Sequence, residues 1–179
     1  LTGTFSDHDH FRYIRENMPD LEVVNMRDLR TKRQRSYGHW GDNEFDEWGQ
    51  PYYGDDYIPY EAFKEMKFLS YVVWPEHLKG IGDLAFAGCN LRGSLIFPES
   101  LKHIGGSVFE GYSLQMSALS GEIYIPSTVE YIGGNAFGGY DGRGTNLSGE
   151  LVLPAKMKYL GPAFNCCQHL TGKIQIPEG

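Results

Sequence analysis

Two histidines flank an acidic residue near the start of the chain, at His8, Asp9 and His10. Imidazole and carboxylate groups are ligands for several divalent metals, so this triplet is one candidate for metal chemistry. The triplet also follows Ser6, and the segment Ser6–Asp9 has the pattern of a helix capping box. Side chains two positions apart on a helix do not face each other. We therefore interpret the triplet as the first turn of a capped helix and predict no metal site there.

A second group of candidate ligands is the acidic stretch Asp42–Glu47. Clustered carboxylates can bind calcium. The twelve-residue calcium loop, however, needs alternating acidic positions and a central glycine, and this stretch lacks both. We interpret it as a solvated acidic loop, so the sequence predicts no metal centre.

The same part of the chain is dense in aromatic side chains. These rings could form a stacking platform for a sugar or a peptide, with Trp40, Trp48, Tyr52 and Tyr53 as the ligand-binding residues. They could instead pack on the first turns of the fold and shield an open edge. We favour packing, because so many aromatic side chains rarely stay exposed on a soluble monomer. Glycan binding is kept as the alternative.

No motif in the sequence predicts a catalytic centre. No serine lies in a Gly-x-Ser-x-Gly turn, and no phosphate-binding glycine-rich loop with its lysine is present. We therefore predict that the protein is not an enzyme and that it needs no cofactor. The remaining catalytic interpretation places a site in the aromatic insertion or in a flanking domain.

An internal repeat in the sequence predicts the structural elements that would position any binding residues. Five prolines each close an apolar run, at spacings of 23, 28, 28 and 23 residues, and they are Pro75, Pro98, Pro126, Pro154 and Pro177. After the first four, apolar residues follow three and six positions later, and then comes a small residue followed by Phe. The Phe positions are Phe63, Phe86, Phe109, Phe137 and Phe164. A self-similar period in the twenties predicts a leucine-rich-repeat solenoid, whose units bury their apolar edges against their neighbours.

The segment before each proline is predicted to be a short strand. In the copies Leu119–Pro126, Leu147–Pro154 and Leu170–Pro177, apolar residues alternate with variable ones, as in a half-buried strand. We expect an α/β-type repeat solenoid: a curved leucine-rich-repeat array with a parallel sheet on its concave face, short turns elsewhere and one short N-terminal helix. Glycines follow the Ile/Leu column and are expected to let the chain turn tightly toward the Phe: Gly82, Gly105, Gly133 and Gly161.

The chain is predicted to form a single leucine-rich-repeat domain over residues 1–179. Residues 1–57 are divergent N-terminal turns that contain an inserted loop, 32–57, and residues 58–179 hold five repeats, of which the last is incomplete. Repeat proteins normally finish with an atypical polar cap. We therefore expect either a longer native protein or a last strand that pairs with a neighbour.

The N-terminal turns follow the repeat pattern less strictly. Leu1–Phe5 copies the opening of the later strands, so we predict that it is the first of them. Phe11 and Ile14 would share one face of the short helix that follows. Leu21–Met26 is predicted to be the second strand.

Three cysteines occupy positions that predict free thiols. Cys89 and Cys167 lie in the same slot of two repeats, three residues after the Phe. Three turns separate them, or roughly 14 Å at the usual strand spacing, which is too far for a disulfide. Cys166 could reach only its neighbour Cys167, through a strained vicinal bond. We interpret the shared slot as core filler.

The recurring phrase Ile-Gly-x-x-Ala-Phe-x-x-Cys, followed by an apolar strand that ends in Pro, resembles the BspA-type leucine-rich repeat of bacterial surface proteins. Ile81–Cys89 matches it at every consensus position, and Ile104–Phe109 and Ile132–Phe137 match with Tyr in place of the Cys. The resemblance covers most of the chain outside residues 32–57. It implies a parallel-stranded, curved solenoid on an exported protein that is exposed at the cell surface and used for adhesion or partner binding.

Alternation along the strands predicts which side chains lie on the exposed face. The residues four and two positions before each proline should point outward, and the second of these columns is largely apolar. Strands about 4.8 Å apart would join these residues into a stripe. The stripe could simply stabilise cross-strand packing, or it could bind a partner. The predicted ligand-binding residues are Tyr71, Val73, Ile96, Glu122, Tyr124, Glu150 and Val152.

Together these observations predict a non-catalytic protein-interaction or adhesion module that binds a protein or another surface ligand through its concave sheet face. The alternative is a glycan-binding protein that uses the aromatic insertion, residues 37–57. A formal net charge of −7 argues against nucleic acid as the partner. No apolar run is long enough to cross a bilayer. The sequence shows no signal peptide, so an extracellular or cell-surface location follows from the family resemblance alone.

Overall fold

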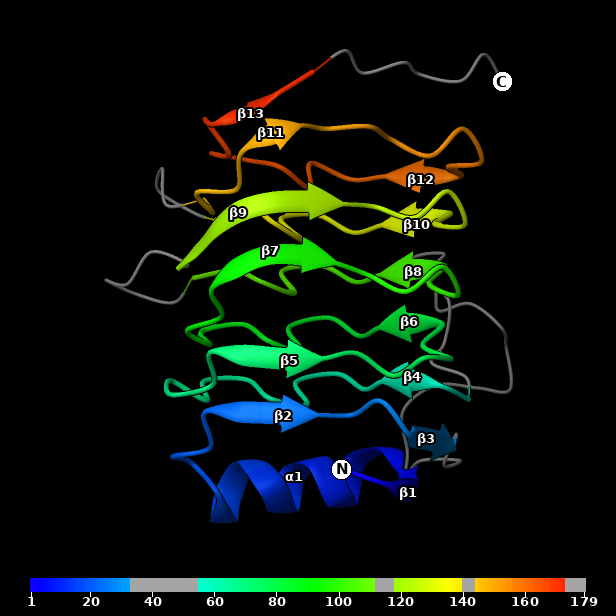
Figure 1. The fold of residues 1–179 in the computed structure, drawn as a ribbon, viewed down its shortest axis with the longest axis vertical. Coiled ribbons are helices and arrows are strands. Elements are labelled where there is room, and N and C mark those ends of the chain that lie inside the picture. Colours follow the sequence, from blue (N-terminus) through cyan, green and yellow to red (C-terminus); the bar gives the residue numbers. More distant parts are fainter. Residues whose placement is uncertain (33–54, 112–117, 140–143, 173–179) are drawn as a thin grey trace.

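The computed structural model describes residues 1–32, 55–111, 118–139 and 144–172, and for residues 6–8 it describes the backbone alone. In these ranges the chain winds into a stack of parallel-stranded turns with a single helix (Figure 1). The helix and the N-terminus lie at one end of the stack, and the last described strand lies at the other. The predicted repeat solenoid is therefore confirmed.

One side of the solenoid is formed by the strands that the proline pattern predicted. We call this set of strands the proline stack. They pair in parallel as β2 with β5, β7 with β9 and β11 with β13. A further parallel bridge between Glu122 and Ser148 continues the stack from β9 toward β11. The strands are β2 (Val23–Asn25), β5 (Tyr71–Val73), β7 (Gly93–Ile96), β9 (Leu119–Tyr124), β11 (Gly149–Glu150) and β13 (Leu170–Thr171).

A glycine at the start of these strands shifts their register. Gly93 pairs with Leu119 whereas Leu95 pairs with Ile123, so β9 carries two more residues than β7 between the same two pairings. Gly93 has a φ of +80°, a left-handed conformation that side chains with a Cβ rarely adopt. The pairing of β7 with β9 therefore contains a bulge next to the Leu-x-Gly that opens β7.

The opposite side of the solenoid carries a second sheet, where only short turns were expected. We call it the isoleucine sheet, because the second residue of each strand belongs to the Ile/Leu column. It is one continuous parallel sheet of five two-residue strands in the order β12-β10-β8-β6-β4. They are β4 (Tyr57–Ile58), β6 (Gly80–Ile81), β8 (His103–Ile104), β10 (Tyr131–Ile132) and β12 (Tyr159–Leu160).

The glycines after the Ile/Leu column were expected to allow a tight turn toward the Phe, but they are required because the backbone of the neighbouring turn lies very close to them. A Cβ on Gly82 would lie 2.6 Å from the backbone nitrogen of Tyr60, and one on Gly133 would lie 2.5 Å from that of Gly106. These glycines therefore let neighbouring turns approach closely. The left-handed residue of the turn comes later, two positions before the Phe, and is not glycine. It is Glu61, Leu84, Ser107 and Asn135 in successive turns.

The N-terminal end is built differently from the expectation. β1 (Gly3–Ser6) pairs in parallel with β3 (Leu29–Lys32) and so does not open the proline stack. The backbone N–H of Asp56 donates to the carbonyl of Thr31 at 3.0 Å, which links β3 to the isoleucine side. Since β3 includes Lys32 and β4 begins at Tyr57, both boundary residues of the predicted insertion lie in strands.

The predicted helix is confirmed as α1 (Asp7–Asn17). Its buried residues are Phe11 and Ile14, which cover the first turn of the solenoid. The ring of Phe11 meets that of Phe63 edge to face, with centroids 5.4 Å apart. The helix therefore closes the N-terminal end of the core, where the repeat would otherwise expose its apolar interior.

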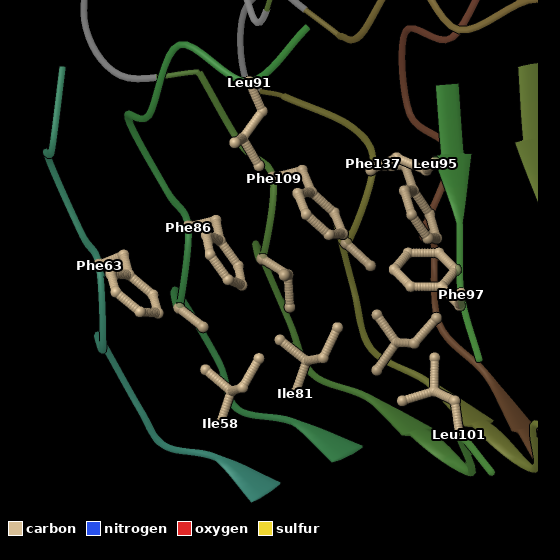
Figure 2. Packing of buried hydrophobic residues seen from close by; sticks show 14 of the residues in the cluster. Ile58, Phe63, Ile81, Phe86, Leu91, Leu95, Phe97, Leu101, Phe109 and Phe137 are labelled. Carbon is tan, nitrogen blue, oxygen red and sulfur yellow. The ribbon is translucent and has the colours of Figure 1, made fainter. Parts of the chain in front are cut away.

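The centre of the core is the Phe column (Figure 2). Successive rings stack nearly parallel with centroids between 5.1 and 5.9 Å apart, from Phe63 through Phe86, Phe109 and Phe137 to Phe164. The first four are at most 3% exposed, whereas Phe164 at the last turn is half-buried. Each ring thus buries its faces against the turns on either side, as nearest-neighbour packing in a solenoid requires.

The three cysteines are free, as predicted. The shared slot has a more specific role than filling space, because the Sγ of Cys89 donates to the carbonyl oxygen of Phe63 at 2.9 Å and that of Cys167 to the carbonyl of Phe137 at 3.1 Å. Each thiol therefore satisfies a backbone acceptor of the preceding turn.

Candidate binding surface

The proline stack separates its side chains as the alternation predicted. Leu95 and Ile123 face the core and are 4% and 8% exposed. Ile96 and Tyr124, the next residue of each strand, pair directly across β7 and β9 and are 67% and 50% exposed. The inside and outside faces of these strands are therefore correctly assigned by the sequence.

Large apolar side chains lie exposed on consecutive turns of this face. Val152 is 67% exposed and Tyr71 is 58% exposed, whereas Val73 is half-buried. Val23, which pairs with Tyr71 across β2 and β5, is 53% exposed and was not singled out from the sequence. We call the six residues of this face the apolar stripe: Val23, Tyr71, Val73, Ile96, Tyr124 and Val152.

A carboxylate holds the ring of Tyr124, which lies between Ile96 and Val152 in the stripe. The hydroxyl of Tyr124 donates a hydrogen bond to Oε1 of Glu99 at 2.8 Å. This bond to the carboxylate raises the pKa of Tyr124 above its ordinary value. Glu99 directly follows Pro98 and belongs to the preceding turn. Sequence reasoning missed Glu99, although its place after the proline one turn before Tyr124 puts it beside that ring.

Two further carboxylates lie beside the stripe. Glu122 and Glu150 are both exposed, as predicted. A Cβ on Gly149 would lie 3.5 Å from Cγ of Glu122, and one on Gly172 would lie 3.2 Å from Cγ of Glu150. The stem of each glutamate thus lies over a glycine of the next turn. Among the described residues, neither carboxylate forms an ion pair.

The charges beside the isoleucine sheet are arranged in the opposite way. The residue just before each strand of the isoleucine sheet is charged, and these residues form one column. In this column, Oδ2 of Asp56 lies 3.1 Å from Nη1 of Arg30 and 3.5 Å from Nζ of Lys79. In the same column, Glu130 forms an ion pair with Lys158. The hydrogen bond from Lys158 lowers the pKa of the Glu130 carboxyl, although the side chain is partly exposed. The acidic side chains of this column are thus neutralised by bases of adjacent turns.

An aromatic ladder completes the isoleucine side. The ring of His103 stacks on that of Tyr131 with centroids 4.5 Å apart, and Tyr131 stacks on Tyr159 at 4.6 Å. A Cβ on Gly80 would lie 2.1 Å from Cε1 of Tyr57, so the ring of Tyr57 leans over this glycine toward His103. His103 is 3% exposed, and burial lowers its pKa to about 4. The rings of His103 and Tyr131 are thus covered by their neighbours, whereas Tyr159 at the end of the ladder is 46% exposed.

Three features of the described residues bear on metal binding and on nucleophile chemistry. No group of three or more His, Cys, Asp or Glu side chains there could hold a metal ion. Burial raises the pKa of the Cys89 thiol to about 12, which makes it a poor nucleophile at neutral pH. A small cavity of about 30 Å³ lies between β5 and β7, lined by Tyr71, Trp74 and Arg92 among others. A volume of this size holds about one or two water molecules.

The alternative binding residues Trp40, Trp48, Tyr52 and Tyr53 lie outside the described residues, as does the acidic stretch 42–47. Whether the aromatic insertion packs on the solenoid or binds a glycan therefore stays a prediction. No helix in the described ranges is long and apolar enough to cross a membrane.

Comparison with known proteins identifies the repeat. No curated protein and no solved structure matches the chain. A family model, the BspA type leucine rich repeat region, matches residues 56–179 in six copies. The match covers more than half of the chain and the same turns whose Phe column and paired strands are described above. The chain therefore belongs to the BspA-type leucine-rich-repeat family.

Proposed function

We propose that the protein is a non-catalytic interaction module that binds a protein partner through the exposed face of the proline stack. Leucine-rich-repeat solenoids are extended scaffolds whose stacked turns present continuous binding surfaces. The binding residues are the apolar stripe with Glu122 and Glu150 beside it. We further propose that residues 1–179 form one repeat domain and that it acts in adhesion at a bacterial cell surface, where proteins of this family are usually found.

The observation that carries the proposal is the contrast between the two sides of the solenoid. On the isoleucine side, acidic groups such as Glu130 are paired with bases of adjacent turns, and the aromatic rings stack on one another. On the proline stack, Ile96, Tyr124 and Val152 are half or more exposed on three consecutive turns. Contiguous exposed apolar surface of this kind marks interaction sites.

Cross-strand packing alone explains the stripe less well. Pairs of β-branched and aromatic residues do stabilise sheets, and Ile96 beside Tyr124 is such a pair. Packing between neighbours would reduce the exposure of both side chains, yet both keep half or more of their surface in solvent. An aromatic residue whose hydroxyl is already held by Glu99 also loses little rotamer freedom on binding.

The test compares two surfaces with two kinds of array. The wild-type protein, Tyr124→Ser and Trp48→Ser are applied to an array of purified extracellular and cell-surface proteins and to a glycan array. The proposal expects hits on the protein array that disappear with Tyr124→Ser and persist with Trp48→Ser. Glycan hits that depend on Trp48 and ignore Tyr124 would instead support the aromatic insertion as the binding site.

A further inference from the structure

Carboxylates lie on both sides of Tyr124 in the apolar stripe. Glu122 precedes Tyr124 by two residues on β9 and so lies on the same exposed face. Glu99 lies beyond the ring, in the turn after Pro98, and accepts the hydrogen bond from the Tyr124 hydroxyl. Glu150 repeats the position of Glu122 one turn later, next to Val152. The apolar stripe is therefore bordered by negative charge where it is most exposed.

The fold itself does not neutralise these carboxylates within the described residues. Arg92 lies at the opening of β7, next to the cavity between β5 and β7, and forms no ion pair with them. Lys173, the next residue in the column of Glu122 and Glu150, lies outside the described residues. Like charges on neighbouring strands repel, so placing them on one face costs stability unless a cation is supplied.

On the isoleucine side, the same repeat places acidic and basic residues on successive turns, where they neutralise one another. There Glu130 is followed one turn later by Lys158, with which it pairs, and it is preceded one turn earlier by Lys102, whose charge also lowers its pKa. A lysine at the position of Ser94 would have placed the same kind of base one turn before Glu122. The acidic border of the stripe is thus not a requirement of the turn geometry.

We infer that the partner of this face is a protein segment in which apolar side chains are flanked by Lys or Arg. Its apolar groups would cover Ile96, Tyr124 and Val152, and its cations would meet Glu99, Glu122 and Glu150. Charge complementarity of this kind speeds association and selects the partner, while the buried apolar contacts supply most of the affinity. The inference rests on the proposed function, since it names the chemistry of the partner at the same face.

The experiment selects ligands without assuming one. A phage library of random twelve-residue peptides is panned on the wild-type protein, and the enriched peptides are synthesised with a fluorescent label. Their affinities are measured by anisotropy against wild type, Tyr124→Ser and the double variant Glu122→Gln/Glu150→Gln. Glu16→Gln serves as the charge control, because Glu16 is an exposed carboxylate on α1, which is separated from β9 and β11 by the turns of β2, β5 and β7 (Figure 1).

The expected peptides combine Lys or Arg with aliphatic or aromatic residues. Their binding should fall at least tenfold with Tyr124→Ser and about three- to tenfold with the double variant, and it should be unchanged with Glu16→Gln. The effect of the double variant should shrink as salt is raised from about 50 to 500 mM, since salt screens exposed charge pairs.

Three results would overturn the inference, and they separate it from the proposed function. Peptides that need Tyr124 but carry no basic residues, or that ignore the double variant, would refute the basic partner and leave the binding face standing. Peptides that bind equally well to Tyr124→Ser would refute both. A selection that enriches no peptide at all would also count against the inference, because an accessible apolar and acidic face should capture short basic-apolar segments.

Discussion

The imidazole of His103 lies face to face with the ring of Tyr131 across β8 and β10, with centroids 4.5 Å apart and planes 16° from parallel. Because this histidine is 3% exposed, its neutral form is strongly preferred in the folded protein. Two adjacent turns are therefore joined on the isoleucine side by a titratable group whose protonation opposes folding.

The acid sensitivity of the fold should consequently depend on His103. Burial lowers its pKa to about 4, whereas the unfolded chain has the ordinary value near 6.5. Above pH 6.5 both states are neutral and the group contributes nothing to the pH dependence. As the pH falls from 6.5 toward 4, the unfolded chain binds a proton that the folded chain does not, so stability is lost.

Between pH 7.5 and 5, this single group should remove about 2 kcal/mol of unfolding free energy. Denaturant melts at the two pH values are compared for wild type and for His103→Phe, which keeps a stacked ring but cannot titrate. The wild type should lose about 2 kcal/mol more than the variant. Equal losses in the two proteins would show that His103 is accessible to protons in the folded state.

The Phe column should be the most sensitive part of the core. Phe109 stacks on Phe86 on one side and on Phe137 on the other, and it is 3% exposed. We expect Phe109→Ala to reduce the free energy of unfolding by about 3–5 kcal/mol, because it opens a cavity between two turns. Urea melts measure this loss. A value below about 1 kcal/mol would contradict the central place of this ring.

Two adjacent glycines should respond differently to the same substitution. A Cβ on Gly133 would lie 2.5 Å from the backbone nitrogen of Gly106, which cannot move without disturbing the neighbouring turn. A Cβ on Gly134 would meet only Pro162, at an ordinary 3.6 Å. Gly133→Ala should therefore cost about 2–3 kcal/mol, and Gly134→Ala less than about 1. Similar thermal melting temperatures for both variants would rule out close turn approach as the reason for Gly133.

The Cys89 thiol should react only slowly with alkylating reagents in the folded protein. Its Sγ donates to the carbonyl of Phe63, and burial raises its pKa to about 12. At pH 8 only about one thiol in ten thousand is then ionised, so iodoacetamide should label this residue far more slowly than it labels the urea-unfolded chain. Peptide mass spectrometry follows the rates. Equally fast labelling in both states would show that the thiol is not held in the core.

Much of the fold could be predicted because the same buried positions recur in every repeat. Each turn places Phe, Ile and the inward strand residues at the same spacing, so a pattern that could arise by chance in one turn is recognised by its recurrence in the others. The second sheet was missed because two residues per strand leave no alternation to detect. The Ile/Leu column could have indicated this sheet. A residue that recurs at the same position of every turn places the backbones of successive turns side by side, where they can form parallel strand pairs.

Conformation at single positions was less predictable. The left-handed residues Leu84, Ser107 and Asn135 are of three different types, so no residue preference reveals the conformation that they share. β1 lies beside β3 although Leu1–Phe5 resembles the openings of the proline-stack strands. Alternation shows which side chains of a strand face inward, but it does not show which strand lies next to it. On the proline stack, the exposed columns were predictable from alternation, whereas placing Glu99 required knowledge of which turn lies next to Tyr124.

The affinity of Tyr124→Ser for a protein ligand identified on the array, measured together with the stability of the variant, tests the proposed binding surface. Because Tyr124 is half exposed and outside the core, its loss should change the free energy of unfolding by less than about 1 kcal/mol. Binding should weaken by roughly 1–3 kcal/mol, as for an aromatic residue at the centre of an interface. Unchanged affinity for Tyr124→Ser, together with lost affinity for Trp48→Ser, would contradict the proposed face and assign binding to the aromatic insertion.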